Sequence, residues 1–436
     1  MSKRLTRAIK AAGLSVLAVL VTTSGLSARY SVAQATRPQA KATYTIGISL
    51  PYLELKELAD GIQRGVAVAI SQANAKHLVM GATFRFKALD DTVNGKHDGA
   101  KDAQNGRQFI NDPTVIGEVG PLNSSAAKVS MPVYNAAGLV QISPSNTNPD
   151  LTNPKFRAKY ETTTATTGSP ITYFRTCTTD AFQGPAGALY VKKAGFKSVF
   201  VTDNQGTYGI GLAKAFQNEA QKIGLKVRGY AELDANNVAS SAQSLATSIA
   251  AKRPDLVYFG GEYGAKGGAE ILADDLKKAG LSKTVFMGGD GIYANDFIKG
   301  SSAGGAYGAL ATSVGGDPRK DPNAQAFLKA EAKMFPGTSV AAYDTYAYDA
   351  ANIILNAFAR AVHAGKIKVG AKMTKDKRLI IARYVAATKD YHGAAGGMSF
   401  DANGDTSNRL IGVYKVFGTG KNAHWGFLTL APKVTM

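Results

Sequence analysis

The feature that most constrains the fold is an alternation of strand-type and helix-type segments that runs along the chain in two arrays. The strand patterns of the first array cover residues 44–50, 84–90, 114–120 and 139–143. The first helical pattern is marked by apolar side chains at helical spacing, namely Leu58, Ile62, Val66 and Ile70. Strands that alternate with helices form parallel βαβ units with right-handed crossovers. The first array therefore predicts a parallel sheet covered by helices.

The second array follows a polar stretch at residues 148–170. Its strand patterns cover residues 198–202, 225–230, 256–259 and 285–287, with helical patterns between them. A long helix is predicted over 340–364, and a hairpin over 410–417 and 425–430. Each array is large enough for a core of its own. We therefore predict an α/β fold of two doubly wound parallel-sheet lobes, with a cleft at the carboxyl ends of the strands.

Composition restricts the class of protein. The chain has 436 residues, a formal net charge of +19 and a single cysteine, Cys177, so it can form no internal disulfide. The basic residues are scattered, with no long run and no basic stripe interleaved with aromatics. This pattern argues against a nucleic-acid partner in spite of the positive charge.

The first residues have the layout of a secretory signal peptide. Lysines and arginines between positions 3 and 10 precede an apolar run at residues 11–20, and small residues lead to the motif Ala33-Gln34-Ala35. The alternative is a membrane anchor, which needs about 20 apolar residues. We therefore predict that residues 1–35 are a signal peptide cleaved after Ala35. Because this signal has no cysteine for lipid attachment, we expect a soluble protein in a periplasm.

Two loops at predicted strand ends carry hydroxyl side chains. Residues 120–125 read Gly-Pro-Leu-Asn-Ser-Ser and open a helix, and residues 143–149 read Ser-Pro-Ser-Asn-Thr-Asn-Pro. Hydroxyls beside backbone N–H groups at a helix N-terminus suit a carboxylate or a phosphate. Ordinary capping and turn formation use the same residues, so both interpretations stay open.

The second array places acids beside glycines after its strands. Glu262 follows Gly260-Gly261, and Asp290 lies between Gly289 and Gly291. Such an acid is commonly a turn residue. It can also be the counter-ion of an ammonium group, which would complete a site for a zwitterion. No nucleophile elbow, zinc-protease motif or P-loop is present, so we expect no catalytic residues, no metal and no cofactor.

Several ordered stretches resemble the leucine/isoleucine/valine-binding proteins of ABC transporters, which have the type I periplasmic-binding fold. These stretches are residues 46–74, 90–112, 142–152, 173–175, 208–209, 286–291 and 396–405. The resemblance implies three crossing segments that act as a hinge. It also implies that residues 42–163 and 314–385 form the first lobe, and that residues 164–313 and 386–436 form the second.

The resemblance assigns roles to individual residues. Ser124, Ser145 and Thr147 match the carboxylate-binding residues of the family, and Asn146 lies between the latter two. Tyr208 matches an aromatic residue that covers the ligand from the second lobe. Asp290 matches the acid that pairs with the α-ammonium group, where other members have glutamate.

The chain also departs from the family pattern. A family tyrosine near the first strand is Leu58 here, and the disulfide of many relatives cannot form. The tyrosine after the Gly-Gly turn aligns either with Glu262 or, with one inserted residue, with Tyr263. If Glu262 faces the cleft, it favours a polar or cationic ligand side chain over leucine.

The resemblance implies an amino-acid-binding protein, without enzymatic activity, that closes two lobes around its ligand. The partners would be a membrane permease and its ATPases, and the protein would be a monomer. A binder of an amide, urea or aromatic acid is the alternative within the class. A sensory or regulatory module of the same fold is the alternative outside it, and because little sequence follows the final hairpin we expect no fused signalling domain.

Overall fold

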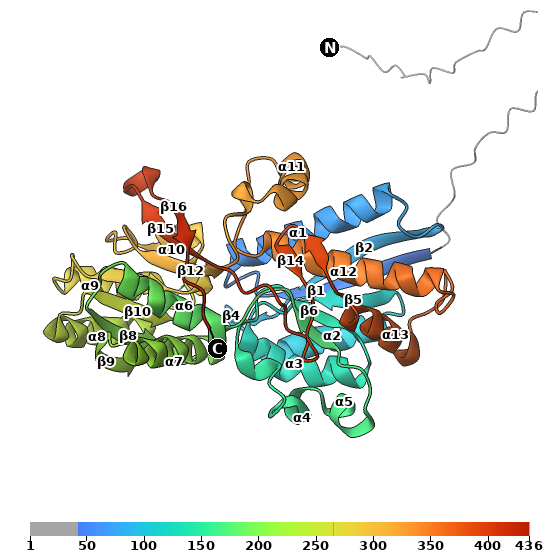
Figure 1. The fold of residues 1–436 in the computed structure, drawn as a ribbon, viewed down its shortest axis with the longest axis horizontal. Coiled ribbons are helices and arrows are strands. Elements are labelled where there is room, and N and C mark those ends of the chain that lie inside the picture. The colour runs from blue at the N-terminus through green and yellow to red at the C-terminus, as the bar shows by residue number, and fades with distance from the viewer. Residues whose placement is uncertain (1–41, 265, 436) are drawn as a thin grey trace, which may run out of the picture. The chain divides into compact units, whose positions relative to one another are not determined.

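A computed structural model describes residues 42–264 and 266–435 of the chain. The predicted signal peptide, residues 1–35, lies outside the described residues. Two sheets organise the described part, one built mainly from the first array and the other from the second array and the C-terminal hairpin (Figure 1).

The first sheet has five parallel strands in the order β2-β1-β5-β6-β7. Its strands are β1 (Ala42–Leu50), β2 (Ala82–Asp90), β5 (Val115–Val119), β6 (Gln141–Ser143) and β7 (Tyr173–Arg175). The surrounding helices are α1 (Lys56–Ala75), α2 (Gly99–Asn111), α3 (Ser124–Ala136), α12 (Asp344–His363) and α13 (Lys375–Ala386). Helix α1 packs beside α12, and α2 packs beside α3 on the other side of the strands (Figure 1).

The second sheet has seven strands in the order β16-β15-β12-β11-β10-β8-β9. Its strands are β8 (Ser198–Asp203), β9 (Lys226–Glu232), β10 (Leu256–Gly260), β11 (Val285–Gly288), β12 (Leu310–Val314), β15 (Ile411–Phe417) and β16 (His424–Leu430). Only the last two are antiparallel to their neighbours, as the predicted hairpin requires. The main helices are α6 (Asp180–Lys193), α7 (Thr207–Lys222), α8 (Val238–Lys252), α9 (Ala269–Lys278) and α10 (Asn295–Gly300).

Shorter elements complete the described chain. The helices are α4 (Arg157–Tyr160), α5 (Thr162–Thr167) and α11 (Gln325–Met334). The strands form two small hairpins, β3 (Thr92–Val93) with β4 (Lys96–His97), and β13 (Tyr391–Gly393) with β14 (Gly396–Met398).

Helices α1 and α12 lie unusually close because two glycines of α1 face α12. A Cβ atom at Gly61 would collide with the side chain of Asp344, and one at Gly65 would collide with its carbonyl oxygen. Arg64, between the two glycines, donates to Asp344 Oδ2 at 2.7 Å and to Glu331 Oε1 at 3.1 Å. This packing fixes the position of the first turn of α1, which borders the cleft.

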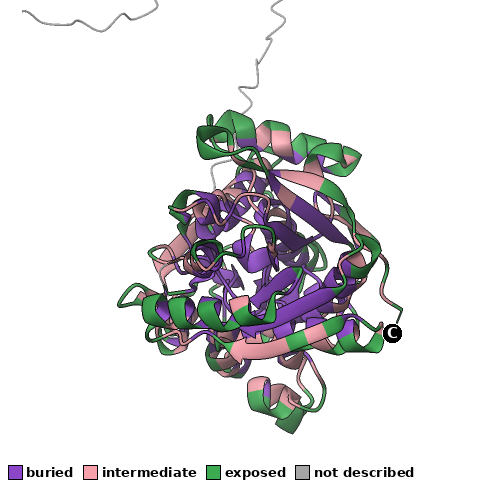
Figure 2. Ribbon diagram, turned by 90° about the vertical axis from the view of Figure 1, so that its left-hand side faces the viewer, coloured by how far each residue is buried: buried purple, intermediate pink, exposed green. Residues whose placement is uncertain are grey.

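Burial follows the layered arrangement. The inner strands are largely buried, whereas the edge strands β2, β9 and β16 and the outer faces of the helices are partly exposed (Figure 2). Leu58, Ile62, Val66 and Ile70, which defined the first predicted helix, are all buried. The predicted parallel sheets and the α/β fold class are confirmed.

Two details differ from the sequence prediction. The long helix begins at Asp344 rather than at residue 340, because the side chain of Tyr343 turns into the cleft and hydrogen-bonds there. Strand β7, which is only three residues long, pairs with β6 in the first sheet. The lobe boundaries stay a prediction; β7 lies within residues 164–313, which that prediction assigns to the second lobe.

Arg175 joins segments that are distant in sequence. It is fully buried, and its guanidinium donates to Asp405 Oδ1 at 2.6 Å and to the carbonyl oxygens of Asn146 and Asn148 at 3.0 and 2.8 Å. A buried charge is tolerated only when it is paired and hydrogen-bonded, as this one is. The contact holds residues 173–175 against the segment that contains Asp405.

Candidate functional site

A small cavity lies where the carboxyl ends of the two sheets meet. Its lining residues are Leu55, Leu58, Leu122, Asn123, Ser124, Ser145, Tyr208, Glu262, Asp290, Gly291 and Tyr343. The volume that the centre of a water-sized molecule can occupy in this cavity is about 20 Å³, which is room for about one water. An amino acid would therefore enter only after the surrounding segments separate.

Asp290 is the acid at the centre of this cavity. It is buried at the start of a short 3₁₀ turn, Asp290–Ile292, directly after β11. Its Oδ1 accepts hydrogen bonds from Gln183 Nε2 at 2.7 Å and from the Tyr208 hydroxyl at 2.8 Å, and its Oδ2 accepts one from the Tyr343 hydroxyl at 2.6 Å. A carboxylate oxygen has two lone pairs, so Oδ2 keeps one acceptor position for a further donor.

The pKa of Asp290 reflects two opposing influences. Burial raises the pKa of this carboxyl, and the hydrogen bonds from Tyr343, Tyr208 and Gln183 act against that rise. None of the described residues that line the cavity is a lysine or an arginine. A cation that enters the cavity would therefore meet an acid that has no ionic partner there.

The opposite side of the cavity is the N-terminus of α3. Its N-cap residue, Asn123, makes no capping hydrogen bond with its side chain, and no other described residue's side chain caps the helix. The first backbone N–H groups of α3 and the positive end of its dipole are thus open to an anion. The Ser124 hydroxyl accepts a weak hydrogen bond from Asn148 N at 3.4 Å, which leaves its own proton free to donate.

Ser145 lines the cavity but uses its proton elsewhere. Its Oγ donates to the carbonyl oxygen of Leu122 at 3.1 Å. A ligand carboxylate could accept from Ser145 only after this hydroxyl turns away from Leu122. Ser124 is the better placed of the two predicted serines.

Asn146 and Thr147 do not line the cavity. The Asn146 side chain donates to Leu122 O at 2.7 Å and accepts from the Tyr173 hydroxyl at 2.9 Å, so it joins the loop to the first sheet. The Thr147 hydroxyl is buried beside Asp180. The turn that presents Ser145 directs the next two side chains into the protein interior.

Glu262 lies between the small cavity and a neighbouring one of about 370 Å³. Its Oε2 accepts from Asn204 Nδ2 at 2.5 Å. Burial raises the pKa of Glu262, and the nearby His97 and Asn204 act against that rise. His97 in turn hydrogen-bonds Glu54 Oε2 through Nδ1 at 2.7 Å.

Tyr263 is directed away from the small cavity. Burial is the largest influence that raises the pKa of its hydroxyl, and the backbone of Leu58 and Glu57 at the start of α1 acts against it. Of the two aligned candidates, Glu262 thus lines the cavity and Tyr263 packs against α1. Tyr343 and Gln183 were missed by the sequence analysis, since no local pattern marks residues that become neighbours only through the fold.

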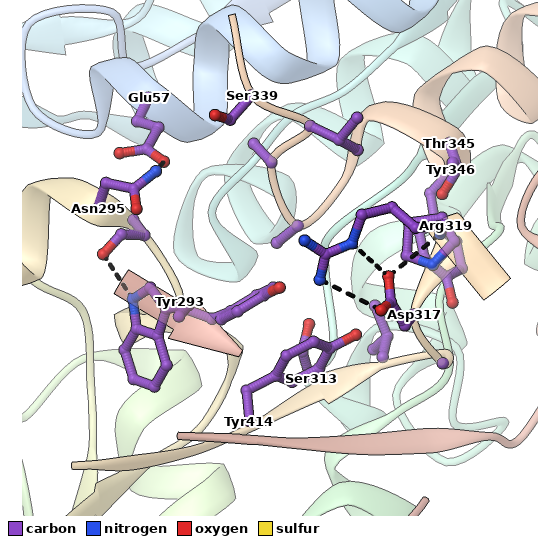
Figure 3. Close-up of a pocket in the computed structure, with 18 of the residues that line it drawn as sticks. Glu57, Tyr293, Asn295, Ser313, Asp317, Arg319, Ser339, Thr345, Tyr346 and Tyr414 are labelled. Atoms are coloured by element: carbon purple, nitrogen blue, oxygen red, sulfur yellow. Dashed lines mark hydrogen bonds and ion pairs between the residues drawn. The ribbon is translucent and has the colours of Figure 1, made fainter. Parts of the chain in front are cut away.

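A second, larger cavity has a volume of about 340 Å³ and shares no lining residue with the small one (Figure 3). Glu57 of α1 lines it from the first sheet's side, and Tyr293, Asn295 and Tyr414 line it from the second sheet's side. Its one arginine, Arg319, is paired with Asp317 through two contacts of 2.8 and 3.2 Å. The guanidinium therefore brings no free positive charge to this cavity.

Within residues 42–264 and 266–435, no group of three or more His, Cys, Asp or Glu side chains could hold a metal ion. None of the helices described for these residues is long and apolar enough to cross a membrane.

Comparison with known proteins identifies the family. The model of the family described as periplasmic binding protein matches residues 54–421. A Leu/Ile/Val-binding protein of Rhizobium johnstonii is 27% identical over 405 residues, which cover 91% of this chain and 97% of that protein.

Solved structures share the fold. A leucine-binding protein from Thermotoga maritima has a TM-score of 0.70 at 23% identity and covers 89% of this chain and 98% of its own. A solute-binding protein of an ABC transporter from R. palustris, in complex with benzoate, has a TM-score of 0.71 at 19% identity and covers 90% and 98%. The chain belongs to the periplasmic binding protein family, a family of extracytoplasmic substrate-binding proteins.

Proposed function

We propose that the protein binds a small amino acid of the leucine, isoleucine or valine type and delivers it to an ABC importer. The observation that carries this proposal is the polarity of the cavity. An open helix N-terminus and the Ser124 hydroxyl lie on one side, and the Asp290 carboxylate with a free acceptor position lies on the other. A zwitterion matches both ends.

The apolar part of the lining supports an aliphatic ligand side chain. Leu55, Leu58 and Leu122 border the cavity. Each methylene group that such a wall removes from water contributes about 0.8 kcal/mol. Glu262 is the one feature that favours a polar side chain, but its hydrogen bond with Asn204 satisfies part of its carboxylate.

The transport role rests on closure. The ligand would contact both lobes and stabilise their closed arrangement by its differential affinity for that state. A permease with its ATPases would recognise the closed form. Export through the predicted signal peptide would place the protein, as a monomer, in the periplasm.

An aromatic acid is the second candidate, since the R. palustris neighbour was solved with benzoate. Such a ligand would use the α3 N-terminus in the same way. It would leave Asp290 without a cationic partner, so the acid itself would have to stay protonated. The two candidates therefore differ in whether the ligand needs an amino group.

Calorimetric titration distinguishes them. The compounds are leucine, isoleucine, valine, benzoate and 4-methylpentanoate, which is leucine without its amino group. We expect an aliphatic amino acid to bind, and 4-methylpentanoate to bind at least about 100-fold more weakly, because its binding leaves Asp290 unpaired. Asp290→Asn should weaken leucine binding by a similar factor. Equal affinity for leucine and 4-methylpentanoate would favour an organic-acid ligand instead.

A further inference from the structure

Glu57 makes contacts that its own helix does not need. It lies in the first turn of α1, on the first sheet's side of the cleft, yet its carboxylate is directed towards α10 on the other side (Figure 3). Its Oε1 accepts from Asn295 Nδ2 at 2.8 Å, and its Oε2 accepts from the backbone N–H of Asp296 at 2.9 Å. Both carboxylate oxygens are thus used across the cleft.

Helix α10 depends on this carboxylate for its first turn. Its N-cap residue is Ala294, whose methyl side chain has no acceptor, and the only side-chain bond described at its second N–H group comes from Glu57. A carboxylate at a helix N-terminus is favoured by both the free N–H groups and the helix dipole. When the two sides separate, this N–H group must exchange Glu57 for water.

Tyr263 lies close to the start of α1. It comes from the second sheet's side, and its buried hydroxyl lies near the backbone of Glu57 and Leu58 without forming a hydrogen bond to a described residue. Helix α1 also lacks a side-chain cap within the described chain, since its N-cap residue is Leu55. Tyr263 thus packs near this N-terminus, whereas Glu57 hydrogen-bonds the helix N-terminus on the opposite side.

We propose that Glu57 is a positioning residue for closure, which holds the two sides of the cleft together without contacting the ligand. Its hydrogen bonds exist only in the closed arrangement, so they stabilise that state relative to the open one. A ligand that binds only the closed state loses apparent affinity in proportion to the population of that state. Removing the Glu57 charge should therefore shorten the lifetime of the complex.

The ligand-dependent test rests on the proposed function and uses the tightest-binding amino acid of the calorimetric panel. In Glu57→Gln the shape is kept, but an amide replaces the carboxylate that faces Asp296 N–H. Charge-assisted hydrogen bonds of this kind contribute enough for an increase in the dissociation rate of roughly tenfold or more. We expect the association rate and the thermal midpoint of the ligand-free protein to change little. Stopped-flow kinetics measures both rates.

Glu219→Gln is the matched control. Glu219 is a glutamate of α7 whose carboxylate pairs only with Lys222 of the same helix, among the described residues. The control should leave both rates unchanged. Equal dissociation rates in Glu57→Gln and the wild type would overturn the proposal.

A second measurement does not require a ligand. Glu57→Ala removes both acceptor oxygens, so hydrogen exchange of the Asp296 amide in the ligand-free protein reports the loss of the acceptor across the cleft. Faster exchange in Glu57→Ala than in the wild type would support the positioning role even if no compound of the panel binds. In that case the proposed function alone would fail. Identical exchange rates would overturn the role of Glu57 whatever the ligand is.

Discussion

Ser124 occupies the first position of α3, where a ligand anion can meet a hydroxyl proton and backbone N–H groups together. Among the described residues, its side chain accepts only one long hydrogen bond, from Asn148, and donates none, so donating to a ligand breaks no existing hydrogen bond within that part of the chain. Ser145 would first have to give up its bond to Leu122. We therefore expect Ser124 to contribute more to carboxylate binding than Ser145.

Ser124→Ala tests this expectation. A hydrogen bond to a charged group contributes about 1.5–3 kcal/mol, so the variant should bind the amino acid roughly 10- to 150-fold more weakly. Calorimetric titration measures the change. The thermal midpoint of the ligand-free protein should move little, because the lost contact with Asn148 is weak.

Thr147→Ala is the control within the neighbouring loop. It also removes a hydroxyl, but this hydroxyl lies beside Asp180 rather than in the cavity lining. The affinity should stay close to that of the wild type. If Thr147→Ala lost more affinity for the amino acid than Ser124→Ala, then Thr147 rather than Ser124 would be the residue that binds the carboxylate.

At the residue scale, the sequence could predict the loops but not the direction of each side chain. Ser124, Ser145 and Asp290 follow strands, and such positions meet at the carboxyl edge of parallel sheets. Whether Asn146 faces the ligand or the interior depends on the turn conformation, which its residue type does not determine. Tyr343 reaches Asp290 from a distant part of the chain, so no local pattern could reveal that contact.

At the element scale, the packing of α2 and α3 against the first sheet buries acids. Asp91, Asp102 and Glu118 are all fully buried. Burial raises the pKa of Asp102 to about 6, while Ser130 and Ser49 act against the rise. Burial also raises the pKa values of Asp91 and Glu118, and the acids add to one another's shifts.

These acids should make the protein less stable as the pH rises. The folded state binds the Asp102 proton more tightly than the unfolded state. The contribution of this proton to the free energy of unfolding is therefore complete below about pH 4 and is lost as the pH passes 6. Asp102→Asn removes this titration. Relative to the wild type, the variant should gain roughly 2 kcal/mol of unfolding free energy between about pH 4.5 and about pH 7.5, measured by urea unfolding.

Asp112→Asn should change the pH dependence of the unfolding free energy in the opposite direction. Hydrogen bonds from Thr114 and the charges of Arg85 and Lys87 outweigh desolvation and lower the pKa of Asp112. Relative to the wild type, this variant should therefore lose stability as the pH rises through the ordinary pKa range of aspartate, about pH 4, and the difference should stay constant at higher pH. If the stability of both variants relative to the wild type changes with pH in the same direction, the burial of Asp102 is not the cause of the change in Asp102→Asn.

The elements that the sequence predicted well are long and periodic. Helix α1 was recognisable because its apolar side chains repeat on one face over several turns. Strand β7 is too short to show a period. Residues 340–343 have a helical composition, but the contact of Tyr343 with Asp290 holds them outside α12. In both cases tertiary contacts override the local preference.

At the scale of the whole molecule, a small number of hydrogen bonds joins segments that are distant in sequence. Arg175 and Asp405 tie two of the segments near the proposed hinge, whereas Tyr343 with Asp290, and Glu57 with α10, connect the two sides of the cleft. The first pair lies in a buried network and the others border cavities. We therefore expect the cleft contacts to open while the hinge contacts persist.

The most direct test of the account is a crystal structure of the protein with the amino acid that binds most tightly. We predict that the carboxylate lies at the N-terminus of α3 within hydrogen-bond distance of Ser124, and that the ammonium group contacts Asp290 Oδ2. Glu57 should still bond Asn295 and Asp296 in the closed complex. A ligand in the larger cavity beside Tyr293 and Tyr414, or one with its ammonium group away from Asp290, would contradict the account.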